Sequence, residues 1–212
     1  MPAGTDVRAP MAALVDATAA ADFAATLIHA RRTVLPKRLA VPGPDALQLE
    51  RILLAASAAP DHDELVPWRF GVVPAAARWR LAETFAAALQ ERDAEATAEQ
   101  LAQAREKAFR APLLLLAIAR LGEANDEVPP AERLVSAGCA LQNMLLMATA
   151  LGFGSSLTSG KALHSAGLRQ LFALAADEQA LCFVNIGTAA STRKPRGRPG
   201  LERYVSELPP AP

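Results

Sequence analysis

The feature that most constrains the fold is a long segment without a charged side chain. Residues 134–153, LVSAGCALQNMLLMATALGF, contain no Asp, Glu, Lys or Arg over twenty positions. About twenty apolar residues suffice to span a membrane, but Gln142 and Asn143 lie at the centre, where polar groups are costly in lipid. We therefore interpret the segment as a long buried central helix. A helix that is apolar all round must be covered on every side, and a second subunit could supply part of that cover.

The balance of acidic and basic residues argues against some classes of binding partner. The 212 residues include 22 basic and 22 acidic side chains, and 51% of the sequence is hydrophobic. Such a chain can bury a substantial core as one domain, which we place at 11–208 behind a loose tail over 1–10. Nucleic-acid binders are usually strongly basic, so we expect no nucleic acid partner. A net charge near zero favours self-association.

Cysteine usage and the N-terminus indicate a cytoplasmic protein. Cys139 and Cys182 both lie in apolar runs, which is typical of buried free thiols and not of a disulfide framework or metal cluster. Asp6, Asp16 and Asp22 interrupt the N-terminal apolar stretch, which is unlike a signal peptide. We therefore expect a cytoplasmic location and no membrane partner.

Hydrophobic periodicity predicts an α+β protein with a central mixed β-sheet flanked by helices. Asp45 followed by Gln48 predicts a capping box at a helix start, and Asp61 with Glu64 repeats that signal at a short turn. Strands are predicted at 69–73, 112–119 and 180–189, the second of them buried on both faces. Helices are predicted at 11–30, 43–60, 75–90, 95–111, 134–153 and 162–175. A proline-rich, extended C-terminal arm follows.

Several catalytic motifs are absent from the sequence. It has no HxxxH or CxxC spacing, so no metal site is expected, and no GxSxG nucleophile elbow. GxGxxG and Walker loops are also missing. The stretch GFGSSLTSG, 152–160, follows a helix and not a strand, unlike a dinucleotide fingerprint. Its backbone N–H groups could meet the edge of a ligand, although a plain turn around a short strand is the simpler interpretation.

Two basic clusters lie far apart along the chain. RRT at 31–33 offers two guanidiniums and a hydroxyl, which suit a phosphate, or else marks a solvated helix end. RKPRGR at 193–198 offers four cations in six residues, or else marks a solvated tail or a nucleic-acid patch. One phosphate held by both clusters would explain why a neutral chain concentrates cations at two distant points.

The stretch APDHDELVPWRF, 59–70, places a histidine and a tryptophan between two apolar segments. His62 is either a polar residue at a helix start or the lining of a pocket. We expect Asp61 to start a turn that aims His62 inward, and Trp68 to anchor the strand behind it. The stretch is then the rim of a pocket for a flat, polar ligand.

Taken in order, these pieces resemble the nitroreductase family of FMN flavoproteins, and most of all its short bacterial branch of NAD(P)H nitroreductases. The segments are RRT, LERILLAASAAPDHDELVPWRF, FRAPLLLL, VPPAERLVSAGCALQNMLLMATALGFGSSLTSG, and IGT with the arginine-rich tail. The resemblance implies a homodimer with two FMN sites at the subunit interface. It also implies that hydride passes from NAD(P)H to FMN, and that a nitroaromatic or quinone-like acceptor is then reduced by a ping-pong mechanism.

The same resemblance implies which residues contact FMN. The phosphate would be held by Arg31, Arg32, Thr33, Arg196 and Arg198. The other implied contacts are His62, Leu65, Leu157, Thr158, Ser159 and Gly160. No catalytic residue is assigned, because solvent can supply protons, and His62 is the best candidate for that role.

The sequence departs from the family pattern at three positions. Leu35 stands where many members carry a cation that reaches the flavin pyrimidine edge, and Ala58 where close relatives can carry an arginine. Asp63 replaces a glycine that is common after the histidine. Because a cation at that edge stabilises reduced flavin, another residue must take the role. The candidates are Lys37, Arg38 and Arg69.

Two rival functions stay open. The missing cations favour an FMN-binding protein without general reductase activity, such as a flavin carrier or a flavin-modifying protein. The third interpretation is a dimer that holds no flavin and uses its arginine-rich tail to contact nucleic acid or an acidic protein.

Overall fold

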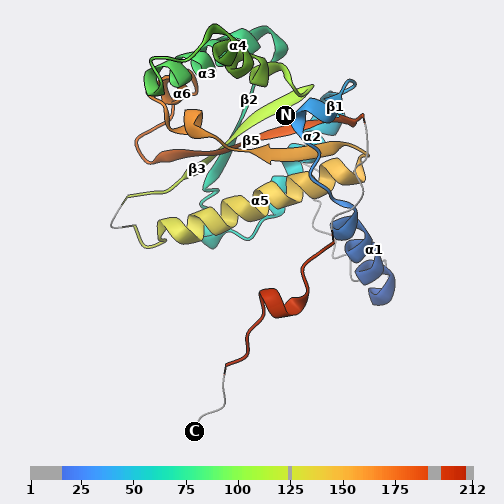
Figure 1. Ribbon diagram of the computed structural model, residues 1–212. Helices are drawn as coiled ribbons and strands as arrows, with labels where there is room; N and C mark the ends of the chain where they lie inside the picture. The colour runs from blue at the N-terminus through green and yellow to red at the C-terminus, as the bar shows by residue number, and fades with distance from the viewer. Residues whose placement is uncertain (1–15, 124–125, 191–196, 209–212) are drawn as a thin grey trace, which may run out of the picture.

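The computed structural model describes residues 16–123, 126–190 and 197–208, so the predicted tail over 1–10 lies outside it. Within these ranges, five strands form one sheet with helices on both faces (Figure 1). The strands are β1 (Leu39–Ala40), β2 (Trp68–Val72), β3 (Leu113–Arg120), β4 (Gly154–Thr158) and β5 (Glu178–Ala189). The α-helices are α1 (Ala17–Ala30), α2 (Ala46–Ala55), α3 (Arg78–Arg92), α4 (Ala98–Glu106), α5 (Pro130–Ala150) and α6 (Ala166–Leu171). Short 3-10 turns include η2 (Pro36–Arg38), η3 (Ala56–Ala58), η4 (His62–Glu64), η6 (Lys107–Phe109), η7 (Lys161–His164) and η8 (Leu201–Arg203).

The sheet is built around β5. Its neighbours β1, β3 and β4 all pair with it in antiparallel register, and β2 pairs antiparallel with β3. The parallel element of this sheet, in the residues described, is a single bridge between Thr33 and Ser155. The predicted α+β class is confirmed. The sheet is mixed only through that bridge.

Strand β3 explains the layered arrangement. Its side chains alternate between faces: Leu115 and Ala117 pack in the core under α5, whereas Leu116 and Ile118 pack in a second core under α3 and α6. All four are at most 1% exposed. The uninterrupted apolar run therefore reflects burial on both faces, as predicted.

The long uncharged segment forms most of α5, which confirms the predicted central helix. One face, including Ala140 and Met144, is buried against the sheet and α2. The opposite face is open, and Val135 is 66% exposed. In the described part of the chain, no helix is both long and apolar enough to cross a membrane.

The local signals at two helix starts had different outcomes. Asp45 and Gln48 form the predicted capping box, because each side chain bonds the backbone N–H of the other residue. The short turn predicted after Asp61 is present as η4, with Asp61 at its N-cap position, but without the side-chain cap bond. The side chain of Asp61 instead accepts a hydrogen bond from the N–H of Val66 at 2.7 Å.

Both cysteines are free thiols. Cys182 is buried, and burial raises its pKa to about 11, whereas Cys139 is only half-buried. The described residues of the C-terminal arm, 197–208, extend away from the sheet with exposed Leu201 and Leu208 (Figure 1). The predicted extended arm agrees with this arrangement.

Candidate functional site

Two arginines from opposite ends of the chain meet beside α1. Arg31 follows the last residue of that helix, and its N–H bonds the carbonyl of Leu27. Arg198, in the C-terminal arm, donates from Nη2 to the carbonyl oxygen of Arg31 at 3.1 Å. The two basic clusters of the sequence therefore converge in space. Arg196, the other tail arginine expected at this place, lies outside the described residues.

This group of arginines concentrates positive charge. Partial burial lowers the pKa of Arg31, and the charges of Arg198 and Arg32 lower it further. No carboxylate of the described ranges forms a salt bridge with any of the three. Guanidiniums bind phosphate through charge-assisted, often bidentate hydrogen bonds. We call Arg31, Arg32 and Arg198 the arginine clamp, and its chemistry suits a phosphate dianion.

Thr33 connects the arginine clamp to β4. It forms the parallel bridge to Ser155, and the N–H of Val34 donates to the carbonyl of Ser155 at 2.9 Å. From Ser155, β4 continues through Leu157, which is 42% exposed, and Ser159 and Gly160 follow the end of the strand. Five extended residues span roughly 16 Å. The predicted residues of the RRT motif and of the Gly/Ser turn thus lie at the two ends of one strand.

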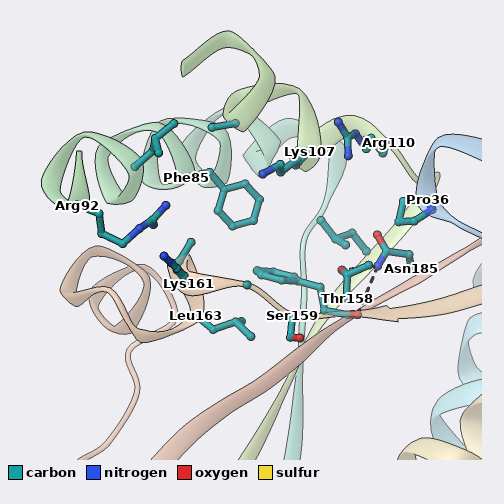
Figure 2. A pocket seen from close by; sticks show the side chains of 16 residues that line it. Pro36, Phe85, Arg92, Lys107, Arg110, Thr158, Ser159, Lys161, Leu163 and Asn185 are labelled. Atoms are coloured by element: carbon teal, nitrogen blue, oxygen red, sulfur yellow. Dashed lines mark hydrogen bonds between the residues drawn. The ribbon is translucent and has the colours of Figure 1, made fainter. Parts of the chain in front are cut away.

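A pocket of about 310 Å³ opens at the far end of β4 (Figure 2). Three of the predicted residues, Thr158, Ser159 and Gly160, line it. The other lining residues come mainly from α3, η6, η7 and β5, and they include Phe85, Leu89, Arg92, Lys107, Arg110, Lys161, Leu163, Phe183 and Asn185. Apolar walls with a few polar groups are typical of sites for flat organic ligands.

Asn185 holds one wall of the pocket in place. It is 2% exposed, and its Nδ2 donates to Thr158 Oγ1 at 3.0 Å. The sequence interpretation missed this residue. The available signal was a single amide in the otherwise apolar run ALCFVNI, since a buried polar group needs a partner.

Four cations line the pocket: Arg92, Lys107, Arg110 and Lys161. No Asp or Glu is among the lining residues. Arg110 pairs with Glu106 beside it, through Nε at 2.9 Å. The pocket is therefore electropositive, although the whole chain has no net charge.

His62 lies elsewhere on the protomer, and its side chain does not line this pocket. Its side chain is 48% exposed, and Nδ1 lies 2.7 Å from Oε1 of Glu132 in the first turn of α5. That contact, followed by the charge of Asp63, raises the pKa of His62. The arginine clamp adjoins the other end of α5, roughly 27 Å away at the helical rise per residue. Neither His62 nor its neighbour Leu65, 36% exposed, lines the pocket within one protomer.

The loop that carries His62 has an unusual backbone. Asp63, Glu64 and Val66 have φ angles of 54°, 54° and 46°, in the left-handed region that side chains disfavour, at about 1–3 kcal/mol each. This conformation explains why a glycine suits position 63. The hydrogen bond from Val66 to Asp61 and the contact between His62 and Glu132 hold the loop in this shape.

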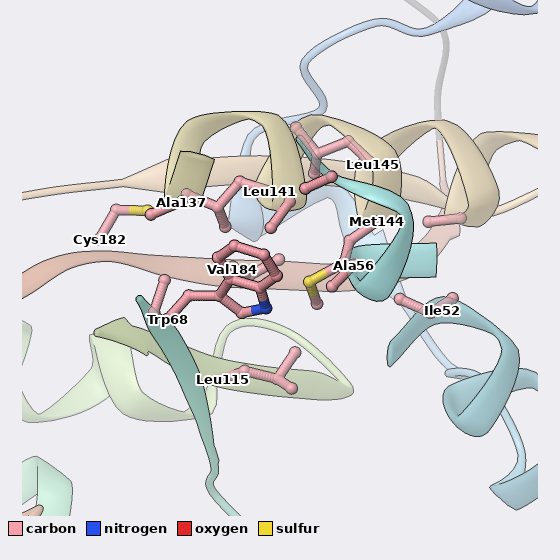
Figure 3. Packing of buried hydrophobic residues seen from close by; sticks show 14 of the residues in the cluster. Ile52, Ala56, Trp68, Leu115, Ala137, Leu141, Met144, Leu145, Cys182 and Val184 are labelled. Atoms are coloured by element: carbon pink, nitrogen blue, oxygen red, sulfur yellow. The ribbon is translucent and has the colours of Figure 1, made fainter. Parts of the chain in front are cut away.

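Trp68 anchors the strand behind this loop, as expected. It is 8% exposed and packs with Met144, Leu141 and Val184 between α5 and the sheet (Figure 3). The next residue, Arg69, forms a salt bridge with Glu178, and its Nη2 lies 2.6 Å from Oε2 of that residue. We therefore do not assign Arg69 to the flavin edge.

Comparison with known proteins identifies a family. A family model described as the nitroreductase family matches residues 28–188. A protein of Haemophilus influenzae named "Putative NAD(P)H nitroreductase" is 36% identical over 165 residues, which are 78% of this chain and 88% of that protein.

Solved structures of low sequence identity share the fold. A nitroreductase-like family protein from Bacillus cereus superposes with a TM-score of 0.75 at 17% identity, covering 87% of this chain and 95% of that one. The FMN and NADPH-dependent nitroreductase NfnB from Sphigopyxis sp. strain HMH gives a TM-score of 0.68 at 21% identity, covering 87% and 98%.

Proposed function

Because this chain belongs to the nitroreductase family, we propose that it is an FMN-dependent oxidoreductase that uses NAD(P)H to reduce a nitroaromatic or quinone-like acceptor. The observation that carries this proposal is the arrangement along β4. The arginine clamp lies at one end of the strand, and the electropositive pocket lies at the other. A ligand with a phosphate at one end and a flat ring at the other matches both places.

The residues present fit FMN at each end. Arg31, Arg32 and Arg198 would bind the phosphate, with the Thr33 hydroxyl as a further donor. The backbone of Ser159 and Gly160 would follow the ring edge, with Asn185 fixing the adjacent Thr158.

Lys107 can supply the positive charge that many family members carry at the position of Leu35. It extends from η6 into the pocket that Thr158 and Gly160 also line (Figure 2). A positive charge held beside the flavin stabilises the negative charge that develops on reduction. We therefore assign to Lys107 the role at the pyrimidine edge for which Lys37 and Arg38 were the sequence candidates.

When bound, FMN supplies the redox chemistry by accepting a hydride from the nicotinamide and passing electrons to the acceptor. The side chains position the reactants and set the electrostatics. Donor and acceptor would use the same open side of the pocket in turn, which gives ping-pong kinetics. No side chain needs to be a proton donor, because the pocket opens to solvent.

A second copy of the chain would complete the site. Apolar side chains are exposed on α1, α2 and α5, namely Phe23, Ile28, Leu47, Leu54 and Val135. Exposed apolar patches of this kind mark interfaces. Because His62 does not line the pocket of its own protomer, we propose a homodimer in which His62 and Leu65 face the flavin held by the partner.

One observation favours a second candidate function. Leu35, 42% exposed, and Ala58 replace cations typical of the family, and fewer cations would make flavin reduction less favourable. The alternative is an FMN-binding protein without general reductase activity. FMN binding without steady-state turnover of a nitroaromatic by NADPH would favour it.

Equilibrium titration with FMN and with riboflavin, which lacks the phosphate, tests the proposal. We expect the protein to prefer FMN, because the arginine clamp binds only the phosphate. Arg31→Ala and Arg198→Ala should each weaken FMN binding about tenfold or more, since a hydrogen bond to a charged group contributes roughly 1.5–3 kcal/mol. Riboflavin binding should not change.

Arg80→Ala is the matched control, because Arg80 is an exposed arginine on α3, away from the proposed interface, and it does not line the pocket. It should leave the binding of both flavins unchanged. Equal affinity of the unmodified protein for FMN and riboflavin would rule out the arginine clamp as a phosphate site.

A further inference from the structure

We propose that Arg92 and Lys161 form a subsite for an anionic group, phosphate or carboxylate, on the molecule that exchanges electrons with the flavin. This inference rests on the proposed function. It concerns recognition of the second substrate and not of FMN itself.

The two cations lie on opposite sides of the pocket. Arg92 is the last residue of α3, where its Nη1 donates to the carbonyl of Ala88 at 2.8 Å. Lys161 begins η7, directly after Gly160. Both side chains are exposed and line the pocket, and their charged ends point toward one another in Figure 2. Their positions therefore suit one anion bound between them.

The charge distribution requires an explanation. In the part of the chain that the structure describes, no carboxylate forms a salt bridge with Arg92, Lys161 or Lys107. The sequence has equal numbers of acidic and basic residues, so acidic side chains were available to neutralise the pocket. Solvent screens like charges on exposed side chains only in part, so cations that line one pocket still repel one another. An anionic ligand would relieve that repulsion.

This anion differs from the cofactor phosphate. The arginine clamp adjoins Ser155, at the opposite end of β4 from the pocket. Lys107 reaches the pocket from another element, η6. Arg92 and Lys161 are therefore free of both flavin roles, and they can bind an anionic group on a ligand that enters beside the flavin ring.

Two sources would supply such a group. One is the 2′-phosphate that distinguishes NADPH from NADH. The other is a carboxylate on an aromatic acceptor. Calorimetric titration of the FMN-loaded protein with NADP⁺ against NAD⁺ tests the first source, and titration with 4-nitrobenzoate against 4-nitrobenzamide tests the second.

We expect the anionic member of at least one pair to bind about tenfold more tightly than its neutral or less charged counterpart. The double variant R92Q/K161Q should reduce that ratio to near one, and added salt should reduce it in the unmodified protein. Both positions are exposed, so the variants should fold. R80Q, an exposed arginine on the same helix α3, should keep the full preference.

The outcome separates this inference from the proposed function. FMN affinity, measured on the same variants, should fall far less than the anion preference, because neither residue belongs to the arginine clamp that binds the cofactor phosphate. Preference in neither pair, or a preference that persists in R92Q/K161Q, would overturn the subsite. Failure of the unmodified protein to bind FMN would overturn the proposed function instead, and calorimetry on that protein would still report the anion preference.

Discussion

Among single residues, Arg198 and Arg31 show how a site can assemble from distant parts of a sequence. Their hydrogen bond joins positions 167 residues apart, and burial with like charges nearby lowers the pKa of Arg31. A cluster of this kind is stable only if hydration or an anion offsets the repulsion. The cluster therefore indicates a ligand more strongly than either motif does alone.

Glu132 should control the ionisation of His62. Its contact with Nδ1 is the main cause that raises the pKa of this histidine. Glu132→Gln should therefore lower the pKa of His62 toward its ordinary value of 6.5, as measured by NMR titration of the imidazole protons. Asp63→Asn should have a smaller effect. An unchanged pKa in Glu132→Gln would show that the contact does not persist in solution.

At the scale of helices and strands, sequence patterns predicted the elements that bury a continuous apolar surface. The runs in β3 and β5, the uncharged α5 and the capping box at Asp45 were all found from local sequence. β1 was missed because it has two residues and depends on pairing with β5. Local patterns thus fail where an element exists only through a tertiary contact.

The same reason limits prediction of the candidate site. The RRT motif, Arg198 and Thr158 were expected from a family resemblance, and the structure places them along β4. The pocket cations on α3, η6 and η7 carry no local signal, because an exposed lysine or arginine on a short helix is usually solvated. The orientation of His62 depends on Glu132, 70 residues away.

The ion pair between Arg69 and Glu178 should make the free energy of unfolding depend on pH. It joins β2 to the start of β5, with Arg120 at 3.7 Å. The hydrogen bonds from Arg69 are the main cause that lowers the pKa of Glu178 from 4.5 to about 2. Because the folded-state pKa is depressed, this contribution is present above pH 4.5 and is lost as the pH falls toward 2.

Glu178→Gln should therefore lower the free energy of unfolding at pH 7 by about 2 kcal/mol, allowing for the solvent around Arg69. Urea unfolding at pH 7 and near pH 3 measures this difference, which should shrink at the lower pH. Glu50→Gln, on the exposed side of α2, is the control. A difference that does not depend on pH would mean that packing, and not ionisation, is the cause.

For the whole molecule, the distribution of apolar surface supports the proposed homodimer. α5 buries one face against the sheet, and its other face stays open beside α1 and α2. The two parts of the expected flavin site also lie too far apart within one protomer. Both observations support the proposed homodimer, with an interface that includes α5.

Val135→Glu should break this dimer. Val135 is 66% exposed on α5, and a buried unpaired carboxylate at an interface is strongly unfavourable. Light scattering should report a monomer, and FMN should bind more weakly because the partner's contribution is lost. Trp79→Glu, at a side chain 61% exposed on α3, places the same charge on the other face of the sheet and should leave a dimer. A dimeric Val135→Glu protein would place the interface elsewhere.

The most direct test of the central claim, that β4 holds FMN between the arginine clamp and the electropositive pocket for reduction by NAD(P)H, is an anaerobic absorption spectrum. The FMN-loaded protein is mixed with NADPH, and a nitroaromatic is added afterwards. The account predicts loss of the flavin absorbance near neutral pH after NADPH, and its return when the acceptor is added. A protein that is colourless after incubation with FMN and removal of the free cofactor, or whose bound flavin is not bleached by NADPH or NADH, would contradict it.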